Sequence, residues 1–400
     1  MAVCDMRVLI VPPNDLLRHP TPNRLYHIAK RLAKKYEIFL LSYTNHPLAG
    51  SVKRCLKAVE VSIPNAIPVR DLSVYYTVNA MQIYNAINCV TKEEGIDVII
   101  HANILPSLIA TKLAKKYGIP NIYDFLDYFP QSAAAYYKHG GLVESVVEAI
   151  VKQALLNSNA IVTHSHTFKL LIKQIIEPKY IPIYIIPNGV DADVFKPMDQ
   201  KLARKAIGLN GEYYLALLYG SLDVWIDIVT ILKIISKMRV RFDIRLLIVG
   251  FSHASHYYKA LLNLIKRFDL DKHTYFYPPQ PYEKIPIFIN ASDVVVAPYI
   301  KILKNYVTPL KIAEALACGV PVITTAIAEF KIWYTQGVYT HSSFEDVERL
   351  LHYVIENGEE IRKALIGYSQ SFRQLFDWNR LAEEYRKVIE SNTKHCVIRS

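Results

Sequence analysis

The feature that most constrains this fold is a regular alternation of short apolar runs with amphipathic, helix-like stretches. The runs expected as strands are residues 7–11, 37–42, 97–101, 121–124, 160–163 and 183–186, and then 214–219, 244–249, 273–277, 293–297 and 320–324. Strands that alternate with helices form a mostly parallel sheet covered on both faces. The sequence therefore predicts an α/β fold.

The alternation stops once, at the turn-rich residues 187–197, and then starts again. Four hundred residues also exceed one ordinary domain and suit two. We therefore expect two doubly wound domains facing a central cleft. Ligands of such folds bind at the carboxyl ends of the strands.

Residues 308–324 predict a helix aimed at a ligand, followed by a buried strand. Thr308 is a good N-cap, Pro309 suits the first helical position and Gly319 ends the helix. Lys311 and Glu314 are three residues apart and share a face near the helix N-terminus. Free N–H groups and a lysine favour an anion, while the carboxylate suits the diol of a ribose. The pattern indicates a nucleotide site, and the alternative is an ordinary capped helix.

Composition and cysteine usage narrow the class of protein. The chain is 52% hydrophobic and 21% charged, which favours a large core over disorder. Five scattered cysteines without CxxC spacing are typical of reduced thiols in a cytosol. No apolar run approaches the ~20 residues that span a bilayer. We expect a cytoplasmic protein that is soluble or peripheral at the inner face of a membrane.

The net charge is +11, and part of the excess lies in residues 1–60. That segment has ten Lys or Arg residues against four acids, a balance of +6. Such a surface suits an anionic membrane, nucleic acid or a phosphorylated acceptor, and the alternative is a solvated helix face. No zinc-finger, RNP or helix-turn-helix pattern is present, so nucleic acid is not expected as a partner.

Several enzyme classes are excluded by missing motifs. None of the 14 glycines forms GxG, and there is no GxxxxGK[ST], GxSxG or HExxH. Two histidine pairs, His164 with His166 and His253 with His256, have spacings more typical of surface or capping residues than of metal ligands. We expect no metal site.

Several motifs together resemble glycosyltransferase family 4. Residues 185–197, Ile-Ile-Pro-Asn-Gly-Val-Asp-Ala-Asp-Val-Phe-Lys-Pro, resemble the segment that closes the first domain in that family. Leu-Tyr-Gly-Ser-Leu at 218–222, Leu-Leu-Ile-Val-Gly at 246–250 and the whole 308–324 segment resemble its donor-domain motifs, in the same order. The resemblance covers nearly the whole chain.

The resemblance implies the GT-B fold, with two Rossmann-like domains and a final helix that crosses back to the first. It places an acceptor domain at 1–190 with a crossover helix at about 376–400, and a donor domain at 191–375. It implies retaining transfer of a sugar from a nucleotide sugar, of UDP or GDP type, without metal or other cofactor. The acceptor would be a glycan or a lipid-linked molecule.

The resemblance also assigns the donor-site residues. Glu314 would bind the ribose hydroxyls, and Thr308, Pro309 and Leu310 would provide donors to the diphosphate. Ser221 would lie beside the distal phosphate. The loop after Tyr277, with Pro278 and Pro279, would pack on the base.

On the acceptor side we expect Asp127, which follows a first-domain strand, to orient the acceptor hydroxyl or accept its proton. His101 ends another strand on the same side and is expected to touch the sugar. The alternatives are a helix-capping aspartate and a packed strand-end histidine. Arg18, His19 and Arg24 lie in or near the first β–α loop and are expected to hold an anionic acceptor, or else to solvate the helix entry.

Departures from the family pattern leave a second hypothesis open. Tyr306 stands where most members have a glutamate, and Ser221 and Ile226 stand where many have cations. Phosphate neutralisation would then depend on Lys311, helped by Lys301 or Lys304. The alternative is a non-catalytic GT-B scaffold or regulatory partner of another transferase. A nucleotide-sugar epimerase or glycogen-type synthase ranks third.

Overall fold

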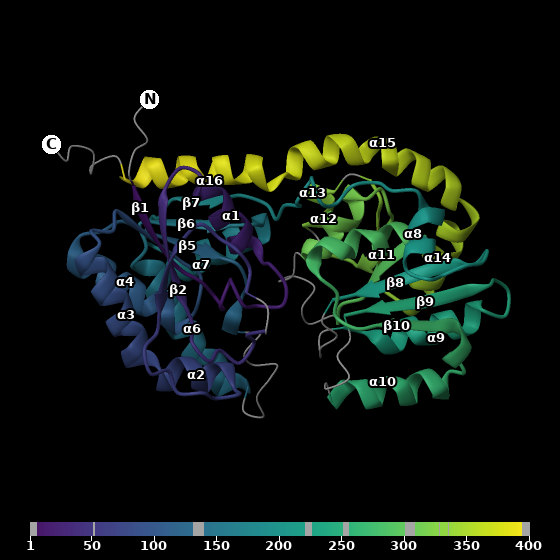
Figure 1. Ribbon diagram of the computed structural model, residues 1–400, viewed down its shortest axis with the longest axis horizontal. Helices are drawn as coiled ribbons and strands as arrows, with labels where there is room; N and C mark the ends of the chain where they lie inside the picture. The colour runs from purple at the N-terminus through teal and green to yellow at the C-terminus, as the bar shows by residue number, and fades with distance from the viewer. Residues whose placement is uncertain are drawn as a thin grey trace. The chain divides into compact units, whose positions relative to one another are not determined.

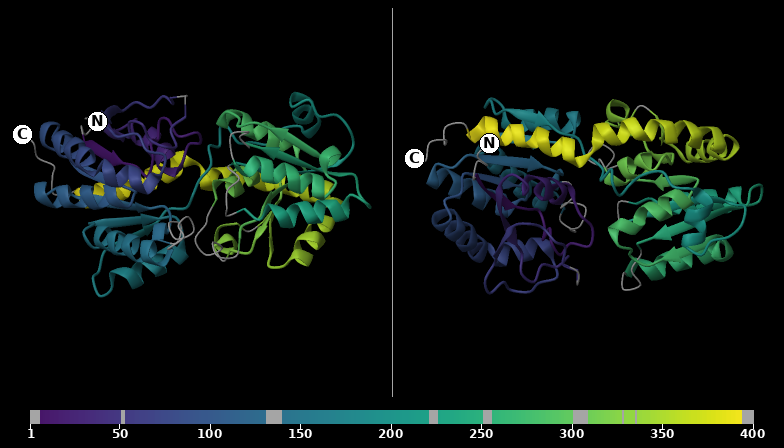
Figure 2. Two further views of the ribbon diagram at one scale, coloured as in Figure 1. Left: turned by 90° about the horizontal axis from the view of Figure 1, so that it is seen from below. Right: turned by 45° about the horizontal axis from the view of Figure 1, so that its top comes forward.

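The computed structural model describes residues 6–50, 53–130, 140–220, 226–250, 256–300, 309–327, 329–334 and 336–393. The chain forms two compact units. One comprises residues 1–187 together with 378–400, and the other comprises residues 188–377. Each unit is a parallel sheet with helices on both sides (Figures 1 and 2).

The described residues of the first unit form a seven-stranded sheet in the order β3-β2-β1-β4-β5-β6-β7. Its strands are β1 (Arg7–Val11), β2 (Glu37–Ser42), β3 (Val59–Ser62), β4 (Val98–His101), β5 (Asn121–Phe125), β6 (Ala160–Thr163) and β7 (Ile183–Ile185). All neighbours pair in parallel, so their carboxyl ends lie at one edge. Val11 pairs with His101, and His101 pairs with Tyr123.

Helices cover both faces of this sheet because successive strand side chains point to opposite sides. The helices are α1 (Arg24–Leu32), α2 (Leu72–Val78), α3 (Ala80–Glu93), α4 (Leu105–Tyr117), α6 (Gly140–Leu156), α7 (His166–Ile176) and α16 (Trp378–Thr393). Leu9, Phe39 and Ile99 belong to a buried cluster that also contains Ile83 of α3 and Leu113 of α4. Val8 and Ile10, also fully buried, face the opposite side.

Helix α1 has one apolar face and begins after Asn23. Leu25, Ile28, Ala29 and Leu32 are buried, as the spacing predicts. In the sequence, Thr21 followed by Pro22 has the pattern of a cap and a first helical residue and predicts that the helix begins there, but this prediction is wrong. Asn23 is the N-cap, and its side chain accepts a hydrogen bond from the backbone of Tyr26. The asparagine side chain thus satisfies one of the free N–H groups in the first turn of α1.

Both chain segments that connect the units are fixed to α1 within the first unit. Arg24 Nη1 donates to the carbonyl of Pro187 at 2.7 Å. The ring of His27 stacks on Trp378, the first residue of α16, with centroids 5.2 Å apart. Arg31 Nε donates to Asn379 Oδ1 at 3.1 Å. Helix α16 packs along α1 and so completes the first unit (Figure 1).

The described residues of the second unit form a six-stranded sheet in the order β10-β9-β8-β11-β12-β13. Its strands are β8 (Tyr214–Tyr219), β9 (Ile244–Val249), β10 (Thr274–Tyr277), β11 (Val294–Ala297), β12 (Val322–Thr325) and β13 (Val338–His341). Its α-helices are α8 (Gln200–Ala206), α9 (Ile228–Met238), α10 (His256–Arg267), α11 (Ile285–Ala291), α12 (Leu310–Ala317), α13 (Phe330–Trp333), α14 (Phe344–Glu356) and α15 (Gly358–Phe376). Two 3₁₀ turns, Asp271–His273 and Tyr282–Lys284, complete it.

Both sheets have the doubly wound strand order: successive strands are added first on one side of the first strand and then on its other side. The predicted α/β fold with two Rossmann-like units is confirmed. Two strands, β3 and β13, are absent from the prediction, and both are at sheet edges. Both contain polar residues and are mostly exposed or partly exposed, so their hydrophobic signal is weak.

Gly319 ends α12 in a Schellman motif. Its N–H bonds to the carbonyl of Leu316, and the N–H of Val320 bonds to that of Ala315, both at 3.0 Å. The φ of Gly319 is +71°, and a Cβ there would lie 3.0 Å from Cγ1 of Ile366 and 3.2 Å from its backbone. Glycine is therefore required both by the left-handed backbone and by the close approach of α15.

We expect Gly319→Ala to destabilise the protein by about 2 kcal/mol, from left-handed strain and the contact with Ile366. Denaturant unfolding of the full chain measures this. Gly358→Ala is the matched control, because nothing lies within 4 Å of a Cβ there and its φ is not positive. An equal effect of the two substitutions would contradict the packing argument.

Candidate active site

Helix α12 begins one residue later than predicted. Its first residue is Leu310, and Pro309 is the N-cap residue, with ψ 136°. The prediction that Pro309 is the first helical residue is wrong, because its extended ψ places it outside the helix. Thr308, the predicted cap, lies outside the described residues. The first N–H groups of a helix have no acceptor inside it, so Leu310 and Lys311 offer donors to an anion.

Lys311 places a cation at the carboxyl end of β8. Its Nζ donates to the carbonyl of Tyr219 at 2.9 Å. It lies 5.7 Å from the ring centroid of Tyr219 and 5.9 Å from that of Tyr299. A Cβ on Gly220 would come within 3.4 Å of Nζ, so glycine leaves room for the ammonium. Burial lowers the pKa of Lys311 to about 8, which keeps it mostly charged at neutral pH.

Glu314 lies one turn further along α12 and is 7% exposed. Its Oε2 accepts a hydrogen bond from the Tyr219 hydroxyl at 2.8 Å. Burial raises the pKa of Glu314 to about 7, against the opposing effects of that hydrogen bond and of the Lys311 charge. The predicted pair of Lys311 and Glu314 is thus joined through Tyr219, which the sequence prediction did not include.

Other predicted donor residues lie near strand ends of the same unit. Tyr277 is the last residue of β10; its hydroxyl donates to the carbonyl of Ile207, and its ring contacts Phe288. Pro278 follows it, and its carbonyl accepts from Gln280 Nε2 at 3.0 Å. Ser221 lies outside the described residues, as do Lys301, Lys304 and Tyr306. Contact of the 278–281 loop with a base remains a prediction.

In the first unit, Asp127 follows the carboxyl end of β5 and is partly exposed. His101 ends β4 and is fully buried. Its Nε2 lies 2.9 Å from Asn121 Oδ1, and its ring lies against Tyr123. Burial lowers the pKa of His101 to about 4. His101 is therefore a neutral packed residue with no exposed surface for a sugar, whereas Asp127 has such surface.

Arg18 belongs to a polar network formed by Asp15 after β1, Ser42 at the end of β2 and Glu60 within β3. Its Nη1 lies 2.7 Å from Glu60 Oε1, 2.7 Å from Ser42 Oγ and 3.1 Å from Asp15 Oδ2. The ring of neighbouring His19 bonds to the carbonyl of Thr21, and burial lowers its pKa. Arg18 is partly exposed, but two carboxylates already compensate its charge.

Arg24 lies in a buried ion pair and is 3% exposed. Its Nε is 3.3 Å from Oδ1 of the fully buried Asp124 on β5, and its Nη1 bonds to Pro187. Asp124 and the buried Tyr385 of α16 also affect each other's pKa. The prediction that Arg24 holds an acceptor does not fit this position, because the side chain has almost no accessible surface.

The basic residues of 1–60 are largely used inside the first unit. Their ion pairs join Arg7 to Glu37, Arg18 to Asp15 and Glu60, Lys35 to Glu383, and Lys53 to Glu60. Within the described ranges, no helix has the length and apolarity needed to cross a membrane. The same part of the chain has no group of three His, Cys, Asp or Glu side chains placed to hold a metal ion.

Two family models match the chain and together span most of it. Residues 22–194 match "Glycosyltransferase Family 4", and residues 199–371 match "Glycosyl transferases group 1". The boundary between the matches falls in the turn-rich segment that separates the two sheets. The chain therefore belongs to glycosyltransferase family 4, with the GT-B fold.

Individual relatives are distant. D-inositol 3-phosphate glycosyltransferase of Mycobacterium tuberculosis is 25% identical over 158 residues, which is 39% of this chain and 32% of that protein. The chain thus spans about a third of the length of this curated relative. The sucrose-phosphate synthase structure from Thermosynechococcus elongatus has a TM-score of 0.79 at 15% identity, covering 96% and 98% of the two chains. Anabaena Alr3699/HepE, in complex with UDP and glucose, has 0.73 at 14%, covering 96% and 100%. These structures show the shared fold.

Proposed function

We propose that this protein transfers a hexosyl group from a nucleoside diphosphate sugar to a hydroxyl of a glycan or lipid-linked acceptor. The observation that carries the proposal is the meeting of the α12 entry, the Lys311 ammonium and the Glu314 carboxylate at the end of β8. The helix entry and the ammonium suit a diphosphate, and the carboxylate suits the hydroxyls of a ribose. Family membership and the UDP complex of HepE, which shares the fold, support it.

In this proposal the second unit binds the donor and the first unit binds the acceptor. Glu314 accepts hydrogen bonds from the ribose hydroxyls. Lys311 and the α12 entry, from Thr308 to Leu310, contact the diphosphate, with Ser221 beside the distal phosphate. Tyr277 and Pro278 support the base. We expect the nucleotide to be of UDP or GDP type, and titration with different nucleoside diphosphates identifies its base.

The proposed reaction proceeds with retention and without a metal ion. The bond from the anomeric carbon to the diphosphate breaks, and a bond to the acceptor oxygen forms on the same face. The acceptor proton passes to the leaving phosphate oxygen, so no strong general base is required. Negative charge that develops on the leaving group is stabilised by the Lys311 ammonium and the positive end of α12.

On the acceptor side we assign Asp127 to orienting the acceptor hydroxyl, and Arg18 and His19 to the rim of the acceptor site. Arg24 and His101 are assigned to packing of the first unit instead, because of their burial. A lipid-linked acceptor would bring the protein to the cytoplasmic face of a membrane as a peripheral protein. The pairing of many basic residues in 1–60 means that such contact would need other surfaces as well.

The direct test is calorimetric titration of the full chain with UDP, GDP, ADP and dTDP, with and without EDTA. We expect one diphosphate to bind unchanged by EDTA, and Glu314→Ala to weaken it about 30-fold or more, because charge-assisted bonds to the ribose are lost. Glu359→Ala, an exposed α15 carboxylate, is the control. Absence of binding for all four nucleotides would overturn the proposal.

A second candidate function is a non-catalytic partner of another transferase. The observation that favours it is Ile226, which stands where many family members have a lysine. Ile226 is buried and forms a β-bridge with Tyr299, so this position offers no cation to a phosphate. Nucleotide binding without any release of diphosphate from UDP- or GDP-sugars, with or without acceptor, would favour this candidate.

A further inference from the structure

Tyr219 contacts both charged residues of the candidate donor site, and through different groups. Its hydroxyl lies 2.8 Å from Glu314 Oε2 and 3.0 Å from the carbonyl of Lys311. Its own carbonyl accepts the hydrogen bond from Lys311 Nζ, and its ring lies beneath that ammonium. One residue at the end of β8 therefore binds the side chains of two residues on α12.

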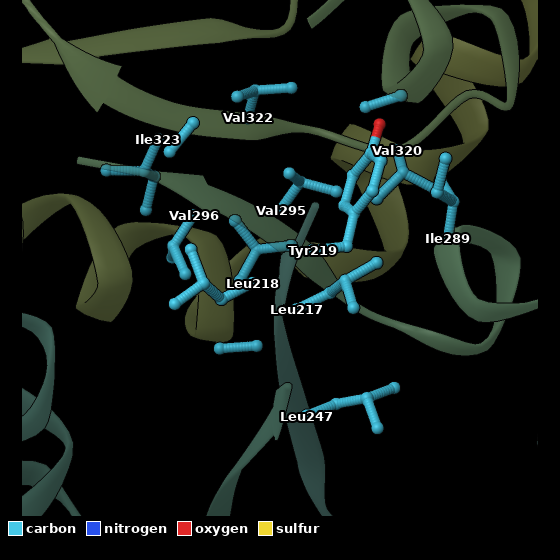
Figure 3. Close-up of a cluster of buried hydrophobic side chains, with 14 of the residues drawn as sticks. Leu217, Leu218, Tyr219, Leu247, Ile289, Val295, Val296, Val320, Val322 and Ile323 are labelled. Carbon is cyan, nitrogen blue, oxygen red and sulfur yellow. The ribbon is translucent and has the colours of Figure 1, made fainter. Parts of the chain in front are cut away.

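Tyr219 is enclosed by the core of the second unit. It is 5% exposed and belongs to the buried cluster of the second unit. Figure 3 shows it among apolar side chains such as Leu217 and Val295, with its hydroxyl oxygen drawn in red. A tyrosine hydroxyl in such surroundings needs a hydrogen-bond partner, and the carboxylate of Glu314 is the stronger acceptor of its two. The contact thus fixes the carboxylate as well as the hydroxyl.

We propose that Tyr219 is the positioning residue of the donor site, holding the Glu314 carboxylate and the Lys311 ammonium in register for a nucleoside diphosphate. This rests on the function proposed above. In this arrangement Tyr219 touches neither ribose nor phosphate. It acts through Glu314, whose second oxygen is left for the ribose, and through Lys311, which its carbonyl and ring hold beside Gly220.

The role has a consequence for the pH dependence of nucleotide binding. The titratable groups that face Glu314 are Tyr219 from β8, Tyr299 after β11, and Lys311 and Cys318 from α12 itself. Hydrogen-bond donation from Tyr219 favours the charged carboxylate and so lowers the pKa of Glu314. Without the hydroxyl, Glu314 takes up its proton at higher pH, and the ribose loses its charged acceptor there.

Tyr219→Phe tests this, because it removes the hydroxyl and keeps the ring and the carbonyl. The affinity for UDP, or for GDP if that is the nucleotide identified, is measured by calorimetry from about pH 6 to 9. At each pH the ratio of variant to wild-type affinity is compared, so that titration of the nucleotide cancels. We expect a loss of about tenfold near pH 7. The loss of affinity should become smaller as the pH rises. The pH below which affinity falls should be higher for the variant than for the wild type.

Tyr75→Phe is the matched control. Tyr75 is a fully buried tyrosine of the first unit whose hydroxyl donates to the carbonyl of Thr44, and we expect unchanged nucleotide affinity for this variant. A loss in Tyr219→Phe that is equal at every pH, or no loss, would overturn the positioning role while leaving the donor site intact. If wild-type protein binds no nucleotide, the proposed function falls and the inference with it. Thermal melting of each variant verifies folding.

Discussion

Replacing Lys311 with methionine is expected to lower kcat/KM for a nucleotide sugar roughly 100- to 1000-fold. Its ammonium is the cation that the described residues place at the end of β8, and Ile226 offers none nearby. Loss of one preorganised group that stabilises developing charge has an effect of this size. Methionine keeps much of the apolar stem, so packing between Tyr219 and Tyr299 changes little. The measurement is release of nucleoside diphosphate from the donor.

Lys233→Met is the control, since Lys233 is an exposed lysine on α9. It should leave kcat/KM within about a factor of two, as surface substitutions usually do. Wild-type turnover in the Lys311 variant would show that phosphate charge is neutralised elsewhere. The scaffold hypothesis would instead be supported if neither wild type nor variant turned over any donor.

Replacing Arg24 with methionine is expected to destabilise the protein by about 3–5 kcal/mol. The substitution removes the guanidinium between Asp124 and Pro187 and leaves a buried carboxylate without its cation. Burial already raises the pKa of Asp124, and Arg24 is the main group that opposes this rise. Denaturant unfolding of the full chain measures the loss, which should appear in the transition of the first unit.

Two further variants make this prediction specific. Arg349→Met removes the exposed ion pair with Asp346 and should change stability by less than about 1 kcal/mol. The double variant Arg24→Met, Asp124→Leu replaces both charges by apolar groups and should recover part of the loss. Equal stabilities of the Arg24 and Arg349 variants would contradict a buried ion pair that stabilises the first unit.

Much of the fold could be predicted from the sequence because the strands of a doubly wound sheet are apolar along their whole length. The boundaries of β1, β2, β6, β8 and β9 agree with the prediction. The missed strand β3 has exposed and partly exposed residues and a glutamate, so it lacks that apolar signal. Cap positions were less predictable, because Thr21 and Asn23 have similar capping chemistry and only packing selects between them.

Some residues of the candidate site could be predicted from the sequence and others could not. Lys311 and Glu314 could be paired from the sequence because helical spacing alone places them on one face. Tyr219 could not, because it lies 92 and 95 positions from these residues, and their contact depends on how β8 and α12 pack. The burial of Arg24 could not be predicted from the sequence either. Its partner Asp124 is 100 residues away, and a basic residue near a helix start is ordinarily solvated.

The attachment of both connecting segments to α1 has a consequence for how this protein tolerates change. The chain leaves the first unit after Pro187 and re-enters it at Trp378, and Arg24 and His27 hold these two points. Because both connections contact α1, a change in the position of α1 affects the contacts of Pro187 and of Trp378 together. A single substitution in α1 is therefore expected to weaken both connections. Second substitutions that restore stability are expected at residues 187 and 378–385 rather than along α1.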